Sequence, residues 1–348
     1  MNLKLNNYLI SPFIDFMLLG GGALLTYIFI LIIGFTIQFD VVFWMFFLAF
    51  FVNSPHFMIS YEIFYKSFSK KIGFNKYSIV GLIIPILLFL LILIGIFYDS
   101  KKIFTLLLLS MFFLVGWHYI KQSYGCFIVY SAGNKIYYNK IEQNLIKYSL
   151  YPLWIGSFLN IFANGKFNNY WGLEYNFSWI LNEHTLFINI FSISGILVFL
   201  YVMINHYFQK KQLPNLIALT PILIGYIWLS PIFLNDIYFY MIPFFHSLQY
   251  FLFSGVYTHN EIKNEQSGLK GWIKWWGAAF ILGALTFEIL PTYLDQTFSQ
   301  KSIITQHIFL ISLIFFINIH HYFIDSVIWK GENEDVRKNL LFKERVKK

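Results

Sequence analysis

Long apolar segments constrain this chain more than any other feature. A helix of about 20 apolar residues crosses the hydrocarbon core of a bilayer, which is about 30 Å thick. In a helix every backbone polar group is satisfied inside the segment, as lipid requires. Short polar loops separate the apolar segments, which predict ten membrane-spanning helices at residues 13–37, 40–62, 77–98, 102–130, 145–164, 185–208, 214–232, 236–258, 271–290 and 301–329.

The composition agrees with a membrane location. Hydrophobic residues make up 58% of the 348 residues and charged residues only 12%, against roughly a quarter charged in a soluble domain. We therefore expect an all-α integral membrane protein, in which residues 1–330 form a single transmembrane helical bundle and residues 331–348 a charged, mobile cytoplasmic tail. In a prokaryote the membrane would be the cytoplasmic (inner) membrane.

The distribution of basic residues predicts the orientation. The N-terminus, alternate loops and the tail hold 20 of the 25 Lys and Arg residues, the opposite loops hold four, and Lys121 lies inside a predicted helix. Because cytoplasmic loops are enriched in Lys and Arg, both termini are expected in the cytoplasm. The net charge of +8 then reflects topology, and we expect no nucleic-acid partner.

Two further features concern the loops and the cysteine content. Residues 165–184 form the longest outer loop, and Trp171, Tyr175 and Trp179 predict a segment lying at the membrane interface. Cys126 is the single cysteine, so an intramolecular disulfide and a Cys-rich metal site are excluded.

Histidines dominate the polar residues inside the predicted helices. The second, fourth, eighth and tenth helices all run toward the cytoplasm, and each carries histidine 10 to 13 residues before its inner end. At about 1.5 Å per residue, these imidazoles share a depth roughly 15–20 Å from the inner boundary. Ionisable groups inside membranes commonly mark functional sites. We therefore predict a metal centre with ligands drawn from His56, His118, His246, His320 and His321.

Polar neighbours on the same helical faces are expected to support these ligands. A metal-bound histidine needs a hydrogen-bond partner for its second ring nitrogen. Gln122, Gln249, Tyr250 and Asp325 lie three or four residues from a predicted ligand, where they would orient it or contact substrate. Pro55 and Pro243 are expected to kink their helices and open a pocket.

Hydrogen bonding between helices is the structural alternative for a single membrane histidine. We apply that interpretation to His206 and His307, and treat the acidic groups outside the cluster as helix-end or interface residues, namely Asp15, Glu62 and Glu288.

Ligand chemistry limits the metal. Neutral nitrogen donors with little carboxylate suit iron, zinc or copper and disfavour magnesium and calcium. The His-Glu-x-x-His, Gly-x-Ser-x-Gly and Glu-x-x-His motifs of other enzyme classes are absent. A di-haem cytochrome needs histidines at two depths, so a b-type haem is the less favoured cofactor.

The histidine segments resemble those of a known membrane family. Residues 55–62, 117–119, 245–250 and 319–325 are similar, in order, to the motifs of the Brp/Blh-like family. That family consists of polytopic proteins regarded as iron-dependent β-carotene 15,15′-dioxygenases. The resemblance covers about a tenth of the chain, and it implies iron, dioxygen and a lipid-soluble substrate.

This chain departs from the family motifs at three points. Tyr250 stands where the family has a second histidine, and Ser60 where it usually has an aspartate. The family spacing to Asp325 selects His320, whereas helical-face geometry pairs Asp325 with His321, so both remain candidates. The number of predicted helices also exceeds that expected for the family, which implies a different substrate.

The sequence thus predicts a membrane-embedded non-haem metal oxygenase, with iron favoured and zinc or copper compatible, acting with dioxygen on a hydrophobic or lipid-soluble substrate. The alternative is a transporter or channel in which the same histidines relay protons, metal ions or a small polar metabolite across the midplane.

Overall fold

The computed structural model describes residues 8–34, 39–69, 73–162, 169–170, 172–174, 180–239, 241–299, 302, 304–330 and 333–340. The described chain is helical apart from one two-stranded antiparallel hairpin, β1 (Asn169–Tyr170) and β2 (Leu173–Glu174). This confirms the predicted all-α class. Among the described residues, six helical segments are long and apolar enough to cross a membrane: Pro12–Ile33, Lys76–Phe97, Lys101–Gly133, Thr185–Lys210, Gly268–Phe298 and Ile308–Ile328. The count of ten crossings remains a prediction.

The described residues up to 133 form four long helical segments, two of which contain a π-helical turn. The elements are α1 (Pro12–Phe16), the π-helical turn η1 (Met17–Gly21), α2 (Gly22–Ile33), α3 (Phe39–Phe68), α4 (Lys76–Ser78), the π-helical turn η2 (Ile79–Ile83), α5 (Ile84–Phe97) and α6 (Lys101–Gly133). Gly20 has φ 148° within η1, a conformation that glycine adopts readily. The chain bends there, directly after Leu19, whose carbonyl oxygen accepts a hydrogen bond from Gln249 of α12.

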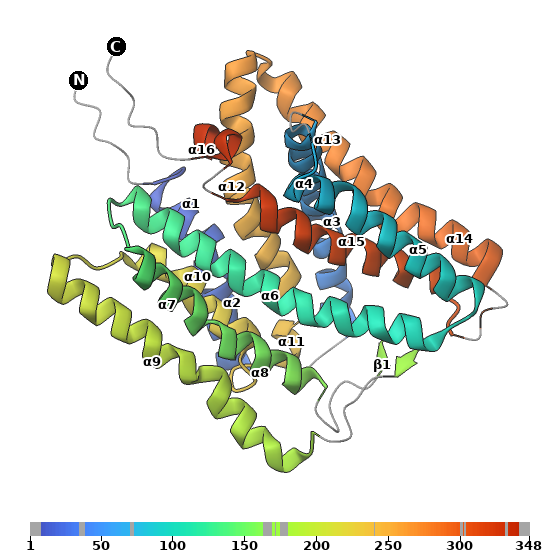
Figure 1. Ribbon diagram of the computed structural model, residues 1–348, viewed down its shortest axis with the longest axis horizontal. Coiled ribbons are helices and arrows are strands. Elements are labelled where there is room, and N and C mark those ends of the chain that lie inside the picture. Colours follow the sequence, from blue (N-terminus) through green and yellow to red (C-terminus); the bar gives the residue numbers. More distant parts are fainter. Residues whose placement is uncertain are drawn as a thin grey trace.

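The remaining helical elements are α7 (Lys140–Ser149), α8 (Tyr151–Ile161), the 3₁₀-helix η3 (Asn182–His184), α9 (Thr185–Lys210), α10 (Leu216–Leu229), α11 (Asp236–Phe239), α12 (Ile242–Glu265), α13 (Gly268–Ala284), the π-helical turn η4 (Leu285–Ile289), α14 (Leu290–Phe298), α15 (Ile308–Ile328) and α16 (Glu334–Leu340). Figure 1 shows α3, α6, α12 and α15 crossing near the middle of the molecule. These four helices carry the predicted histidines.

Prolines separate or start two of the helices at points that differ from the predicted boundaries. Residues 145–161 of the predicted helix 145–164 lie on two short helices, α7 and α8, and Pro152 lies in the first turn of the second. Pro243 likewise lies in the first turn of α12 and starts that helix instead of kinking it. Pro55 lies inside α3.

The tenth predicted helix starts later than expected. The Asp295 carboxylate accepts hydrogen bonds from Phe309 N (2.8 Å) and Leu310 N (3.1 Å). These are unpaired donors of the first turn of α15, so a distant carboxylate caps this helix. Residue 301, the predicted start, lies outside the described residues.

The described part of the tail is folded, unlike the mobile extension that the sequence predicts. Val336 and Leu340 of α16 are buried, and Asn260 of α12 donates a hydrogen bond to the Asn339 carbonyl oxygen (2.6 Å). Helices α1 and α16 lie toward the same end of the molecule (Figure 1). The location of this end of the molecule in the cytoplasm remains a prediction.

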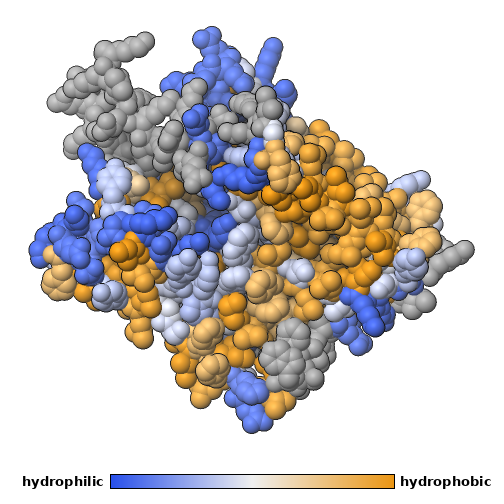
Figure 2. All heavy atoms as spheres, viewed as in Figure 1, coloured by the Kyte–Doolittle hydropathy of each residue, from blue (hydrophilic) through white to orange (hydrophobic). Residues whose placement is uncertain are grey.

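Apolar side chains cover much of the outer surface. Helix α5 exposes Leu87, Phe89 and Leu90, which are 60%, 55% and 48% exposed. Figure 2 shows a broad hydrophobic area over the part of the molecule that includes α5 and α14. A soluble protein rarely exposes so large an apolar area, so this surface suits contact with lipid. The predicted interfacial residues Trp171, Tyr175 and Trp179 lie outside the described residues.

Candidate metal centre

His56 on α3 presents one ring nitrogen to the centre of the bundle. Its Nδ1 donates a hydrogen bond to the Asn53 carbonyl oxygen at 2.6 Å and lies 3.2 Å from Ser247 Oγ. With the proton on Nδ1, the Nε2 atom carries a free lone pair. The Asn53 backbone carbonyl group thus holds the His56 ring in this orientation. The side-chain amide oxygen of Asn53 accepts a separate hydrogen bond from Ser247 Oγ (3.0 Å).

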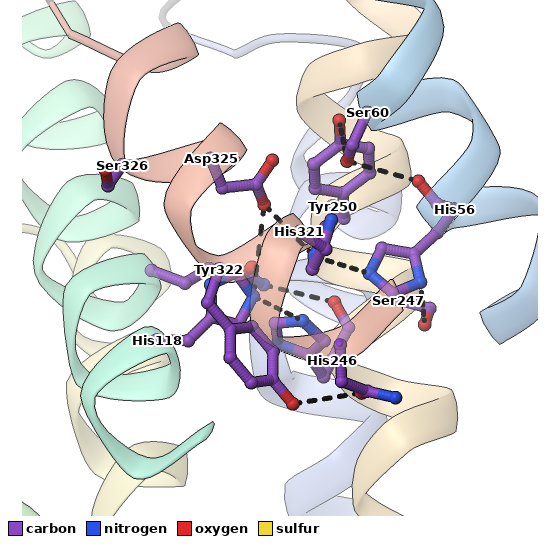
Figure 3. A network of polar contacts seen from close by, with 12 residues as sticks. His56, Ser60, His118, His246, Ser247, Tyr250, His321, Tyr322, Asp325 and Ser326 are labelled. Atoms are coloured by element: carbon purple, nitrogen blue, oxygen red, sulfur yellow. Dashed lines mark hydrogen bonds and ion pairs between the residues drawn. The ribbon is translucent and has the colours of Figure 1, made fainter. Parts of the chain in front are cut away.

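Three other helices bring imidazoles to the same point. His321 Nε2 on α15 lies 3.2 Å from His56 Nε2, and His118 Nε2 on α6 lies 3.1 Å from His246 Nε2 on α12. The His118 and His321 ring centroids are 4.9 Å apart, and those of His56 and His246 are 5.4 Å apart. All four side chains are buried. Figure 3 shows them converging from separate helices.

Asp325 joins this cluster differently from the prediction. Its Oδ2 lies 3.4 Å from His321 Nε2 and 3.9 Å from His118 Nε2. The carboxylate therefore faces the Nε2 atoms, which converge on the centre. The sequence predicts that it would support the opposite ring nitrogens, Nδ1, and it does not. His321 Nδ1 has no hydrogen-bond partner in the described part of the chain. Asp325 is accordingly placed as a candidate ligand (Figure 3).

Two of the separations between these donor atoms fit ligands of one metal ion. With metal–nitrogen bonds of about 2.0–2.1 Å, neighbouring ligand nitrogens lie about 2.8–3.4 Å apart for angles between octahedral and tetrahedral values. The measured separations of 3.1 and 3.2 Å fall within this range. Two groups of buried residues could hold a metal ion: His56, His246 and His321, and His118, His321 and Asp325. They share His321, which places them at one location.

His320 lies outside the cluster. Its Nδ1 accepts a hydrogen bond from the Tyr61 hydroxyl (2.8 Å), and its Nε2 donates to the Val80 carbonyl oxygen in η2 (2.8 Å). Both ring nitrogens are thus engaged by protein groups. Of the two candidates that the sequence left open, the structure brings His321 to the centre and uses His320 to join α15 to α3 and η2.

The two predicted glutamines support the ligands through the backbone. Gln122 Nε2 donates to the His246 carbonyl oxygen (3.1 Å) and to Gln249 Oε1 (3.0 Å). Gln249 Nε2 donates in turn to the Leu19 carbonyl oxygen (2.6 Å). This chain of bonds links α6, α12 and η1. In the described structure neither amide has a hydrogen bond to an imidazole nitrogen, so their predicted role in orienting the rings is indirect.

Tyr250 contacts the cluster through its ring. The ring centroids of Tyr250 and His56 are 5.2 Å apart, and Ser60 Oγ donates to the Tyr250 hydroxyl (2.6 Å). Ser60 and Tyr250 are two of the positions at which the chain departs from the family motifs. They contact each other, so the two departures form one hydrogen-bonded pair beside the site.

Two aromatic residues that the sequence did not predict lie next to the ligands. Tyr322 packs on His118, with ring centroids 4.8 Å apart, and donates to Asn318 Oδ1 (3.0 Å). Tyr119 packs on His246 at 4.5 Å. Each directly follows a predicted histidine, but residues adjacent along a helix usually face different directions. The contacts arise because the histidine partner belongs to another helix.

Asp15 and His206, which the sequence assigned to structural roles, bond to protein groups away from the histidine cluster. The Asp15 carboxylate accepts from Leu9 N (2.7 Å) and from the Tyr130 hydroxyl (3.0 Å). His206 Nδ1 lies 3.0 Å from Glu142 Oε1, which joins α9 to α7. Neither group contacts the histidine cluster.

Comparison of the chain with protein-family models, with curated proteins and with solved structures gives no match.

Proposed function

We propose that this protein is a membrane-embedded non-haem metal oxygenase, with iron as the metal, that uses dioxygen to oxidise a hydrophobic substrate. The observation that carries the proposal is the convergence of four histidine Nε2 atoms from α3, α6, α12 and α15. Neutral nitrogen donors favour iron, zinc or copper, and the resemblance to the Brp/Blh-like motifs favours iron and oxygen chemistry.

The chain contributes ligand geometry, charge and a dry environment. The hydrogen bond from His56 Nδ1 to the Asn53 carbonyl oxygen keeps the Nε2 lone pair directed inward. The Asp325 carboxylate would offset part of the charge of a divalent cation. Iron held by these residues would supply the redox chemistry toward dioxygen. The burial of all four imidazoles excludes bulk water from the reacting groups.

Two adjacent histidines provide the test. Both His320 and His321 are buried on α15, but only His321 belongs to the candidate ligand groups. We expect purified wild-type protein, reconstituted with iron, zinc or copper, to bind a stoichiometric metal without a haem absorption band. His321→Ala should lose that metal, as should His118→Ala, His56→Ala and His246→Ala, whereas the matched control His320→Ala should retain it.

Elemental analysis and an optical spectrum measure these outcomes. A wild type that stays metal-free after reconstitution would reject the metal centre and favour a transporter with a histidine relay. Loss of metal from His320→Ala but not from His321→Ala would reject the assigned ligands. Retained metal without oxidation of carotenoids or other lipids would leave a metal protein and reject the oxygenase activity.

A further inference from the structure

Phe57 is an apolar side chain that lies against two of the candidate ligands. Its ring centroid is 4.3 Å from that of His56 and 4.7 Å from that of His321, and the side chain is buried on α3. The ring of Phe287, in the π-helical turn η4, lies 5.4 Å from the Phe57 ring and is only partly buried. Two phenyl rings in contact therefore lead from the ligands toward the outside of the bundle.

The segment that carries Phe287 lies at the periphery of the molecule. Residues Gly268–Phe298, which comprise α13, η4 and α14, are the least buried of the six membrane-length segments among the described residues. Helix α13 packs on α3, and both η4 and α14 contact α15. Figure 1 shows α13 and α14 along one edge of the molecule. Within η4, Leu285 and Ile289 are 42% and 59% exposed. On this side a single peripheral helix separates the ligands from lipid.

The depth of Phe287 agrees with that of the histidines. Phe287 lies 13 residues after Lys274, the last basic residue before it. At about 1.5 Å per residue it is about 20 Å from the cytoplasmic end of the segment, the depth at which the histidines are expected. That depth lies inside the hydrocarbon core of a bilayer. Acyl chains, and apolar molecules dissolved among them, would therefore contact η4 from outside.

The peripheral helix is irregular where it passes the two rings. Leu290 N donates to the Leu285 carbonyl oxygen, five residues back, and Pro291 in the first turn of α14 has no N–H group to donate. Turns of this kind are frequent at functional sites. One turn before Phe287, a Cβ atom at Gly283 would lie 3.1 Å from Ser54. The segment is thus held closely against α3 at Gly283 and is able to bend at η4.

Hydrogen bonds join the helices on other sides of the cluster. His320 joins α15 to η2 through the Val80 carbonyl oxygen, and Gln249 joins α12 to η1 through the Leu19 carbonyl oxygen. Opening the bundle at either place would break a hydrogen bond that lipid cannot replace. Moving two phenyl rings apart breaks none. The contact between α3 and η4 is therefore easier to open than these two places.

We propose that Phe57 and Phe287 line an entrance between α3 and η4, through which a hydrocarbon-rich substrate passes from the bilayer to the metal centre. The proposal rests on the proposed oxygenase function and adds where its substrate enters. Phenyl rings offer apolar surface and no hydrogen-bond partner, so they admit an apolar chain and disfavour a charged or strongly polar group. Phe57, which contacts both ligand rings, would then select the part of the substrate that reaches the centre.

The test uses a photoreactive hydrocarbon on metal-free protein. Protein in phospholipid nanodiscs is irradiated with hexadecanol that carries a diazirine in mid-chain, and mass spectrometry locates the cross-links. Wild type should be labelled at His56 or Phe57, which are 1% and 4% exposed and which lipid reaches only through an opening. Phe287→Ala should raise this labelling about two- to tenfold, because the contact between the rings is lost. Phe287→Trp should lower it.

A second phenylalanine on α13 provides the matched control. Phe280 lies two turns before Phe287 and stacks on Phe51 of α3, with ring centroids 5.5 Å apart. Phe280→Ala thus removes a ring from the same pair of helices, and it should be labelled at His56 and Phe57 as wild type is. Phe287→Leu keeps an apolar side chain and should give labelling between those of wild type and Phe287→Ala, with a melting temperature close to that of wild type.

Two results would overturn the entrance. One is equal labelling of His56 and Phe57 in Phe287→Ala and Phe280→Ala. The other is cross-linking at Val80 or Leu19 in place of His56 and Phe57, which would put the entrance on another side. Labelling requires neither metal nor turnover, whereas the metal centre is tested by metal content. The entrance can therefore fail while the metal centre is supported, and the reverse.

Discussion

At the scale of single residues, the direction of each imidazole decides its role. His320 and His321 are neighbours on α15, yet one donates to the Val80 carbonyl oxygen and the other lies 3.2 Å from His56 Nε2. Successive residues on a helix point about 100° apart, so only one of them can face a given centre. Helical geometry predicted the pairing of His321 with Asp325, and the structure has that pairing.

Asp325 offers a prediction about charge. Asp325→Asn keeps the shape of the side chain but removes the negative charge beside His118 and His321. We expect metal affinity to fall about 10- to 100-fold, measured by competition with a chelator. Ser326→Ala is the control, because among the described residues that hydroxyl bonds only to the Phe323 carbonyl oxygen. Unchanged affinity in Asp325→Asn would show that the carboxylate does not interact with the metal.

The two glutamines should act as a unit. Gln122 donates to Gln249, which donates to the Leu19 carbonyl oxygen. In a cycle of Gln122→Leu, Gln249→Leu and the double variant, we expect a coupling of about 1 kcal/mol in the free energy of unfolding, typical of hydrogen bonds between membrane helices. Additive effects of the two substitutions would contradict this connection between α6 and α12.

At the scale of helices, close packing depends on residues without bulky side chains. A Cβ atom at Gly195 of α9 would overlap the Ser149 carbonyl oxygen, whereas a Cβ at Gly277 of α13 would meet open space. We expect Gly195→Ala to destabilise the protein by about 1–3 kcal/mol and Gly277→Ala to leave it as stable or slightly more so. Thermal unfolding in detergent measures both, and equal melting temperatures would contradict the tight contact between α7 and α9.

Helix boundaries were predictable where the cause is local. Gly34 ends α2 in a left-handed conformation (φ 64°), close to the limit of the apolar segment. The start of α15 depends instead on Asp295, which is 14 residues away from Phe309. A distant carboxylate leaves no mark in the helix that it caps, so hydropathy alone extended that helix too far toward the N-terminus.

At the scale of the whole molecule, the loops should lie on the sides that their lysines predict. Phe74 and Tyr98 are 80% and 71% exposed at opposite ends of the α4–α5 segment. In a Cys126→Ala background, a membrane-impermeant thiol reagent should label Tyr98→Cys in intact cells and Phe74→Cys only after permeabilisation. The reverse pattern would invert the topology, and labelling of both in intact cells would mean that this segment does not cross the membrane.

Removal of the metal is expected to loosen the whole bundle. Candidate ligands come from α3, α6, α12 and α15, so a bound ion would join four helices. A ligand that binds only the folded state stabilises it by about 2.7 kcal/mol at 100 times its dissociation constant. A chelator should therefore lower the melting temperature of wild type but not of His118→Ala. Equal shifts in both proteins would contradict a structural contribution of the metal.

The amino-acid sequence alone determined the all-α membrane class and the helices that carry His56, His118, His246 and His321, because apolar length and helical period act within one segment. Contacts between segments were decided only by the tertiary structure. It selected His321 over His320, turned Asp325 toward the converging Nε2 atoms and brought Ser60 against Tyr250. Those outcomes depend on how helices rotate and pack against one another, which a pattern along a single helix does not specify.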